Sequence, residues 1–361
     1  WQEAAMAADR WALLAPESVP ARESAAGAML LVGDYLGAEY QLLRILDILE
    51  DSTDAWVLVA RILARSGGNP QQADSVMEEL LKRRSGANSA DVFYARSELA
   101  VQTGDLKRAF ELARRAVELD PEQPDFLTWA GKVAINLDLQ ETGLEYIRRA
   151  WQLEPDNKDL GLAYADLLAR NGKPDEARSV MQALPQTPDV YLSRILFEIG
   201  SKNRPAAEKL FTQLAETTFD DPQEKAYFQA QAAEALGLPL QAIAYLEQVT
   251  DGERGLTATL RRAELLGLEG DFPAARDELE ALRESGDPLA IEQSWLTEAR
   301  ILRELDRKQE SLNVLDQALA ELPDSIAILY THSLLAAELG KVELAEADLR
   351  NEKINYKVRE H

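Results

Sequence analysis

The sequence contains no cysteine, and this absence removes several kinds of chemistry at once. Disulfide bonds, thiolate nucleophiles and cysteine-ligated zinc sites are all excluded. The redox compartment stays open, because a protein of an oxidising compartment can also lack cysteine. No apolar run approaches the roughly 18 residues that a membrane-spanning helix needs, so the sequence predicts no such helix.

Histidine is scarce as well, with only His332 and His361 in the chain. His361 is the last residue and receives no role. His332 falls in a predicted helix at a position usually packed between helices, so we interpret it as a satisfied core histidine. A role as base or metal ligand is the alternative. Because no triad or metal-ligand set is recognisable, we expect no metal, no cofactor and no catalytic site.

Phosphate-binding loops are absent, and the charge is strongly acidic. Gly67 and Gly68 mark a turn that lacks the Lys-Ser/Thr pair needed to hold a phosphate. The formal net charge is -24, from 63 acidic and 39 basic residues. Such a surface repels phosphate backbones and attracts basic partners, so we expect proteins rather than nucleic acid as partners.

What the sequence does contain is a repeat with a period near 34 residues. Predicted turn residues are Gly33, Gly68, Gly104, Asp138, Gly172, Gly200, Gly237, Gly270, Asp306 and Gly340. A small residue follows most of these five positions later: Ala38, Ala73, Ala109, Gly143, Ala177, Ala242, Ala275, Ser311 and Ala345. This period predicts helix-turn-helix units that stack into one continuous array over residues 1–350.

The unit at residues 90–123 illustrates the pattern. It predicts a first helix over 90–103, a turn at Gly104, and a second helix over 106–119 that Pro121 terminates. Its segment ELARRAVELDPEQPD is echoed one unit later by EYIRRAWQLEPDNKD. The small residue after the turn lets the two helices approach closely.

Three regions depart from the pattern. Residues 1–17 correspond to the second half of a cut repeat. Around Gly200 the small residue is displaced to Ala206 or Ala207. Residues 351–361 lack the repeat pattern and are predicted to form an irregular tail. We expect further segments at both ends, and any targeting signal or lipid anchor would precede Trp1.

Over residues 1 to about 350 the chain resembles the tetratricopeptide-repeat family. The resemblance implies an all-α solenoid, a right-handed superhelix of helix-turn-helix repeats that serves as a non-catalytic protein-binding scaffold. In such arrays the first helices line a concave groove. Projected onto this chain, the groove residues are Tyr94, Glu98, Gln102, Thr128, Lys132, Asn136, Leu162, Asp166, Arg170, Arg194, Tyr227, Gln231, Leu260, Leu296, Arg300 and Tyr330.

These residues have a second interpretation, because some of them could belong to the packing layer between repeats. One subset of the family holds chaperone C-termini with a clamp of Lys, Asn and Arg. The clamp pattern is absent here, because the matching positions carry Tyr94 with Glu98, Thr128 with Lys132, and Leu162 with Asp166.

A narrower resemblance covers residues 227–282 and 328–350, which are similar to bacterial outer-membrane tetratricopeptide lipoproteins. It implies a periplasmic adaptor that binds a carboxyl-terminal processing protease and delivers peptidoglycan (cell-wall) hydrolases to it. Membrane attachment would occur only through a lipid anchor that this sequence lacks. The alternatives are a scaffold for an envelope polysaccharide or secretion assembly, and a cytoplasmic location.

Basic pairs recur on successive second helices, at Arg114–Arg115 and Arg148–Arg149, with Lys82–Arg83–Arg84 before them. We interpret them as surface groups that pair with nearby acids. Docking to an acidic partner or an anionic lipid surface is the alternative.

Overall fold

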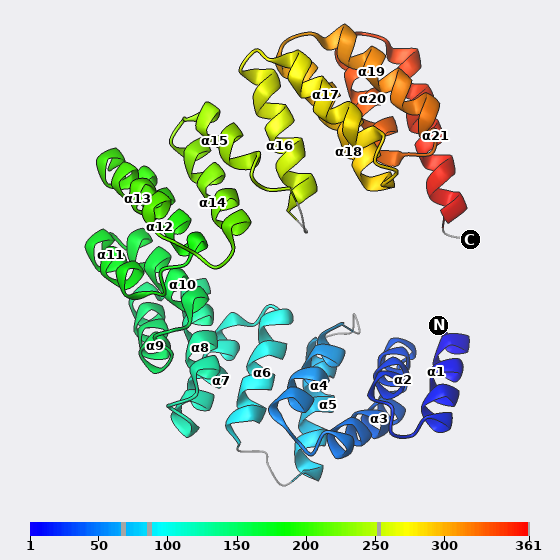
Figure 1. The fold of residues 1–361 in the computed structure, drawn as a ribbon. Helices are drawn as coiled ribbons and strands as arrows, with labels where there is room; N and C mark the ends of the chain where they lie inside the picture. Colours follow the sequence, from blue (N-terminus) through cyan, green and yellow to red (C-terminus); the bar gives the residue numbers. More distant parts are fainter. Residues whose placement is uncertain (66–69, 85–88, 251–253, 360–361) are drawn as a thin grey trace. The chain divides into compact units, whose positions relative to one another are not determined.

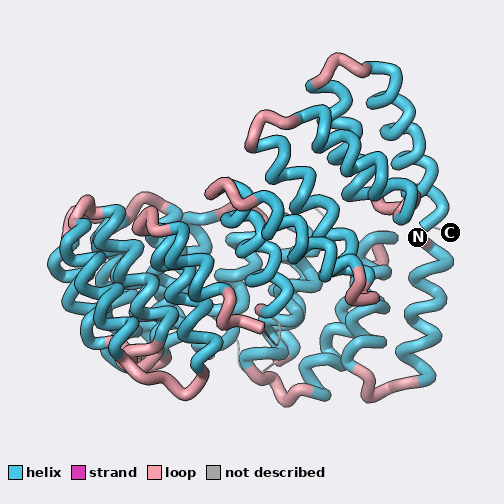
Figure 2. The backbone as a smooth tube through the Cα atoms, turned by 45° about the horizontal axis from the view of Figure 1, so that its top comes forward, coloured by secondary structure: helices cyan, strands magenta, loops and turns pink. Residues whose placement is uncertain are grey.

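The computed structural model describes residues 1–65, 70–84, 89–250 and 254–359, and α-helices joined by short loops dominate these residues (Figure 2). The predicted all-α repeat fold is confirmed. Contacts group the chain into two compact units, unit 1 (Trp1–Pro185) and unit 2 (Gln186–His361). Each unit is described by itself, and a single continuous array over both stays a prediction.

The helices are labelled in Figure 1. Those of unit 1 are α1 (Gln2–Leu14), α2 (Val19–Val32), α3 (Tyr35–Ile48), α4 (Thr53–Arg65), α5 (Pro70–Arg83), α6 (Ala90–Gln102), α7 (Leu106–Leu119), α8 (Pro124–Asn136), α9 (Gln140–Leu153), α10 (Lys158–Arg170) and α11 (Pro174–Ala183). Those of unit 2 are α12 (Pro188–Gly200), α13 (Arg204–Glu216), α14 (Pro222–Ala235), α15 (Pro239–Leu246), α16 (Gly255–Leu268), α17 (Phe272–Arg283), α18 (Pro288–Glu304), α19 (Lys308–Glu321), α20 (Ile326–Glu338) and α21 (Val342–Arg359).

Even-numbered helices are the first helices of the repeats, and odd-numbered helices from α3 onward are the second helices. Each first helix packs against the second helix that follows it, and α1 packs on α2 as the second helix of the preceding half repeat. The two helices predicted for the unit at residues 90–123, which serves below as the reference unit, match α6 and α7 to within one residue. The second of them ends at Leu119, before Pro121, because proline cannot continue a helix.

The turn between the two helices of a repeat has the geometry of a Schellman motif. In the reference unit, the Asp105 N–H donates to the Ala100 carbonyl at 2.8 Å and the Gly104 N–H to the Val101 carbonyl at 3.1 Å. This motif places one residue in the left-handed region. The residues with positive φ at these turns are Gly33, Gly104, Asp138, Gly172, Lys202, Gly237, Gly270, Asp306 and Gly340. The predicted turn residue Gly68 lies outside the described residues.

The predicted turn near Gly200 is present, but Gly200 is not its left-handed residue. Gly200 is the last residue of α12, and the left-handed position is Lys202, with φ of 57°. The Asn203 N–H completes the motif by donating to the Glu198 carbonyl at 2.8 Å. Ala207 then lies five positions after the turn, as in the other repeats, and is fully buried. The sequence prediction chose Gly200 because glycine is the residue most often found at positive φ. Glycine can also be the last residue of a helix, however, and lysine can adopt positive φ at an energetic cost.

The small residue after each turn sits where two helices nearly touch. Ala109, Ala177 and Ala275 are fully buried. At Gly143 of α9, an added Cβ would lie 2.5 Å from Ile135 Cγ1 and 3.0 Å from the Gly131 carbonyl oxygen of α8. A larger side chain at these positions therefore has no space to occupy.

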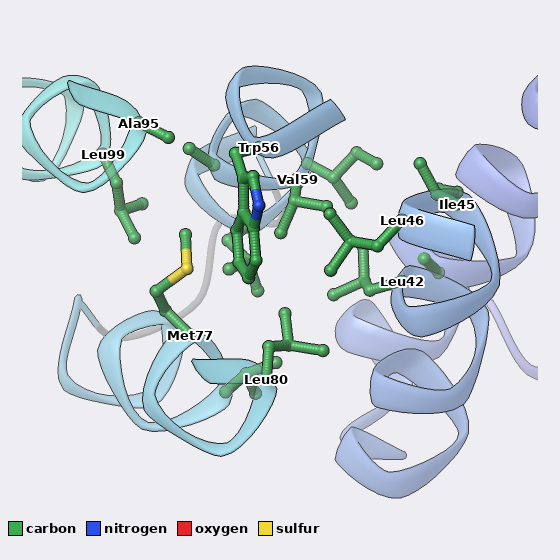
Figure 3. Packing of buried hydrophobic residues seen from close by; sticks show 14 of the residues in the cluster. Leu42, Ile45, Leu46, Trp56, Val59, Met77, Leu80, Ala95 and Leu99 are labelled. Atoms are coloured by element: carbon green, nitrogen blue, oxygen red, sulfur yellow. The ribbon is translucent and has the colours of Figure 1, made fainter. Parts of the chain in front are cut away.

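The largest described core of unit 1 lies among α2, α3, α4, α5 and α6. Figure 3 shows Trp56 of α4 between Leu42 and Leu46 of α3 on one side and Met77 of α5 and Leu99 of α6 on the other. Trp56 is only 2% exposed. Because both second helices α3 and α5 contribute to this core, their opposite faces form the outer wall of the repeat pair.

The end of the chain corrects a second prediction. Residues 351–361 were expected to be irregular, but α21 continues from Val342 to Arg359. The segment NEKINYKVR contains neither glycine nor proline, so nothing in it stops a helix that has already begun. Residues 360–361 lie outside the described part.

Candidate functional site

A groove of about 690 Å³ lies on the first-helix face of unit 1, between α8 and α10. Thr128, Lys132 and Asn136 line it from α8, because a spacing of four residues places all three on one helix face. Asp166 lines it from α10. The remaining lining residues are Pro124, Asp125, Ile135, Ile147, Glu154, Asn157, Asp159, Leu160, Ala163 and Leu167. The structure therefore brings four of the predicted groove residues together, and their binding role stays a prediction.

The charges in this groove are unbalanced. Four carboxylates line it, from Asp125, Glu154, Asp159 and Asp166, against the single ammonium group of Lys132. Asp166 is held by Arg170 of its own helix, with 2.9 Å between Oδ2 and Nε. Among the described residues, the other three carboxylates and Lys132 have no ion-pair partner. The groove thus offers negative charge that the chain does not neutralise itself.

Asp125 and Asp159 were not among the groove residues projected from the sequence. Both lie in the first turn of their helices, where a carboxylate stabilises the positive end of the helix dipole. The N-cap residues are instead Gln123 and Asn157, and only Asn157 caps with its side chain, at 3.1 Å from the Leu160 N–H. The groove role was missed, although the helical phase of Asp125 with Thr128 and Lys132 could have indicated it.

Tyr94 belongs to a packing layer between α6 and α8. Its ring centroid lies 5.2 Å from that of Phe126 and 5.9 Å from that of Trp129, whose Nε1 donates to Ser97 Oγ at 2.8 Å. The Tyr94 hydroxyl donates to Glu98 at 3.2 Å. Burial raises the pKa of both the Tyr94 phenol and the Glu98 carboxyl. The alternative interpretation, inter-repeat packing, therefore describes this residue.

The other predicted residues of unit 1 lie outside the groove lining. Gln102 and Arg170 are exposed, and Leu162 is half-buried.

In unit 2, most of the predicted groove residues make contacts within the unit. The Arg194 guanidinium lies 5.5 Å from the Tyr191 ring centroid and donates to Gln186. The Tyr227 ring lies 5.3 Å below the Arg254 guanidinium. Tyr330 is the open exception, with 51% of its surface exposed. Gln231, Leu260 and Leu296 are half-buried, and both leucines pack against core clusters of unit 2.

A ladder of charges joins the first helices of unit 2. Arg261 of α16 donates from Nε to Glu234 of α14 at 2.9 Å, and from Nη1 to Glu264 at 2.7 Å. Arg300 of α18, another predicted groove residue, lies 3.4 Å from Glu264. Arg300 is therefore already engaged by the chain.

His332 of α20 is buried, with 1% of its surface exposed. Its Nδ1 lies 2.7 Å from Asp348 of α21, and its Nε2 lies 3.1 Å from Asp316 of α19. The interpretation as a satisfied core histidine is confirmed. Among the described residues, no group of three His, Cys, Asp or Glu side chains could hold a metal ion.

The basic pairs on the second helices of unit 1 bind nearby acids. Arg114 lies 2.7 Å from Glu111, Arg115 lies 2.8 Å from Glu118, and Arg148 reaches Glu145 in the same way. All these groups are at least partly exposed, so the pairs contribute little to stability. In the described part of the chain, no helix combines the length and apolar character needed to cross a bilayer.

Comparison with known families agrees with the repeat. Two models described as tetratricopeptide repeat match residues 58–124 and 138–194. These two segments are therefore similar to tetratricopeptide repeats.

Among curated proteins, the TPR repeat-containing protein PA4667 of Pseudomonas aeruginosa is 31% identical to the chain over 103 residues. The match covers 28% of this chain and 17% of that protein, so the chain spans less than a fifth of the relative.

Solved structures with similar helical arrangements include a tetratricopeptide repeat protein from Parabacteroides merdae. It is 17% identical, with a TM-score of 0.40, and the match covers 71% of this chain and 98% of that one. PilF of Pseudomonas aeruginosa is 21% identical, with a TM-score of 0.36 and coverage of 59% and 97%. Scores this low carry no argument about the function of this chain.

Proposed function

We propose that the chain is part of a non-catalytic adaptor of the bacterial periplasm. By resemblance it is of the LbcA type, which binds the carboxyl-terminal processing protease CtpA and delivers peptidoglycan hydrolases to it. The similarity of residues 227–282 and 328–350 to outer-membrane lipoproteins supports this, as does the partial match to a Pseudomonas repeat protein. A lipid anchor outside this sequence would hold the protein at the outer membrane.

In this proposal, the groove between α8 and α10 holds an extended basic segment of a hydrolase. The carrying observation is the excess of carboxylates without an ion-pair partner among the described residues, from Asp125, Glu154 and Asp159, along one open groove. Ile135 and Leu160 supply apolar surface between these charges. The acidic chain attracts a basic partner over distance, and the carboxylates then fix it in register.

An adaptor of this kind works by raising effective concentration. When one surface binds the hydrolase and another binds the protease, cleavage becomes a reaction within one complex. No catalytic group of the adaptor is needed for this. Specificity then lies in which segments the groove accepts.

The test is cleavage of a purified peptidoglycan hydrolase by the processing protease, with and without this chain. We expect the chain to accelerate cleavage, and the double variant Asp125→Asn/Asp159→Asn to reduce this acceleration about fivefold, because two charge contacts are lost. Glu141→Gln, an exposed acid on α9 away from the groove, is the matched control and should change nothing.

Two outcomes would contradict the proposal. Equal acceleration by the groove variant and the parent would remove the groove from substrate binding. Absence of any acceleration, together with synthase or export subunits in a pull-down from envelope extract, would favour the scaffold for polysaccharide or secretion assembly.

A further inference from the structure

A second, smaller pocket of about 210 Å³ lies on the opposite wall of unit 1, between the second helices α3 and α5. Tyr35, Leu36 and Glu39 line it from α3, and Gln72, Val76 and Glu79 line it from α5. The other faces of these helices hold Leu42, Met77 and Leu80 in the core around Trp56 (Figure 3). The pocket is therefore built on a packed and fixed base.

One of the lining residues, Glu39, carries a buried carboxylate. Glu39 is 6% exposed, and its Oε1 accepts no hydrogen bond from any described residue. Arg83 Nε lies 2.7 Å from this oxygen, but without the direction of a hydrogen bond, and the Arg83 side chain is 57% exposed. A buried carboxylate needs a well-oriented cation. The largely exposed Arg83 guanidinium therefore gives the Glu39 carboxylate a positive charge nearby but no well-directed hydrogen bond.

The walls suit a long aliphatic stem. Leu36 and Val76 both line the pocket, Leu36 with 77% of its surface exposed and Val76 buried. The Tyr35 hydroxyl donates to Gln72 Oε1 at 2.6 Å, which fixes the ring beside them. Glu79 also lines the pocket, and the hydrogen bond from Lys82 lowers the pKa of its carboxyl, so that this carboxylate stays ionised. Apolar walls ending at carboxylates match the stem and head of a basic side chain.

We propose that this pocket binds an arginine side chain of a protein partner. The methylene stem lies between Leu36 and Val76, and the guanidinium replaces that of Arg83 at Glu39. Arginine is favoured over lysine because its planar fork can meet a carboxylate with two parallel hydrogen bonds. Arg83 is then the chain's own competitor, which occupies the carboxylate until a partner arrives.

The test uses the full chain and short blocked peptides, Gly-Arg-Gly and its norleucine counterpart. We expect the arginine peptide to bind Arg83→Ala about tenfold more tightly than the parent, because a tethered competitor has been removed. Glu39→Gln in the Arg83→Ala background should abolish this binding. Arg114→Ala, a second-helix arginine that pairs with Glu111 elsewhere in unit 1, is the control and should bind like the parent.

Equal binding of both peptides to Arg83→Ala, or binding that survives Glu39→Gln, would overturn the proposal. If Arg83→Ala does not fold, the NMR resonance of the Arg83 Nε–H in the parent decides instead. Saturating arginine peptide should move this resonance to its position in Glu39→Gln, where Arg83 has lost its charged partner. A resonance that does not move would equally overturn the proposal.

Discussion

The first-helix faces of the two units use charge in opposite ways. In unit 1, Lys132 and Asp159 face an open groove and have no ion-pair partner among the described residues. In unit 2, Arg261 joins Glu234 of α14 to Glu264 of α16, and Arg300 extends the ladder to α18. Charged residues at equivalent positions of the repeat can therefore either form ion pairs between neighbouring helices or remain available to a binding partner.

This difference limits where a partner can bind. The hydrogen bonds from Arg261 to Glu234 and Glu264 raise the pKa of the guanidinium. A ligand that recruited Arg261 or Arg300 would first have to break these contacts. A ligand that approached Lys132 would break none. Unit 1 is thus the better candidate for partner binding on this face.

The largest expected effect tests cohesion in unit 2. Glu298 is 1% exposed and is held by Arg276, at 2.8 Å, and by Arg283, which lies on the Trp295 ring. Glu298→Gln would leave the mostly buried Arg283 charge unpaired and should lower the free energy of unfolding by roughly 3–5 kcal/mol. Urea denaturation, with hydrogen exchange of α17 and α18, measures this.

The matched control for that variant is Glu310→Gln. Glu310 pairs with Arg307 on the surface of unit 2, with 2.7 Å between Oε2 and Nη2. Its loss should change stability far less than the loss of Glu298, because solvent replaces an exposed partner. Equal effects of the two variants would mean that burial does not decide the value of these pairs.

Both units should respond in the same way to a larger side chain at the small residue that follows a turn. Ala109 of unit 1 and Ala275 of unit 2 are both fully buried at the close approach of their helix pairs. Ala109→Leu and Ala275→Leu should each destabilise the protein by roughly 1–3 kcal/mol through overpacking. Thermal unfolding of both variants measures this. A variant as stable as the parent would show that its repeat tolerates a wider helix spacing.

A smaller pair of opposite effects tests the corrected turn. Gly172 of unit 1 has φ of 73°, so Gly172→Ala should destabilise by about 1 kcal/mol. Gly200 of unit 2 is helical, and an added Cβ would meet no atom within 4 Å. Gly200→Ala should therefore stabilise by about 0.5–1 kcal/mol. The denaturation midpoints of the two variants measure these effects. A destabilised Gly200→Ala would indicate that Gly200 is the left-handed turn residue, as the sequence predicted.

The smallest effects concern pH. Burial raises the pKa of Glu98 in unit 1 above its ordinary value of 4.5, so the folded state binds this proton more readily than the unfolded state. Stability from this group should rise as the pH falls from neutral towards 4.5, and Glu98→Gln should remove the rise.

Glu310 in unit 2 has the opposite sign. The hydrogen bond from Arg307 lowers its pKa below 4.5, so its contribution is present above that pH and is lost as the pH falls through the lowered pKa. Stability measured from pH 7 to pH 3 for both glutamine variants gives the two slopes. The same slope change for both would contradict the assigned environments.

The period of turn and small residues was sufficient to predict the helices, because each repeat depends on local capping and on contacts with its neighbour. It placed α6 and α7 to within a residue, and the projected groove residues included Thr128, Lys132, Asn136 and Asp166, which line one groove. It failed at Lys202, where a non-glycine residue adopts the left-handed turn, and at residues 351–359, which are helical.

What the sequence by itself determined is the repeat, its helical phase and its acidic charge, since these follow from spacing and composition. What only the tertiary structure decided is the state of each charged side chain. Lys132 and Arg300 occupy similar places in the pattern, yet Lys132 has no ion-pair partner among the described residues, whereas Arg300 forms an ion pair with Glu264. That outcome depends on which carboxylate a neighbouring repeat brings within a few ångströms, and contacts between helices set this distance.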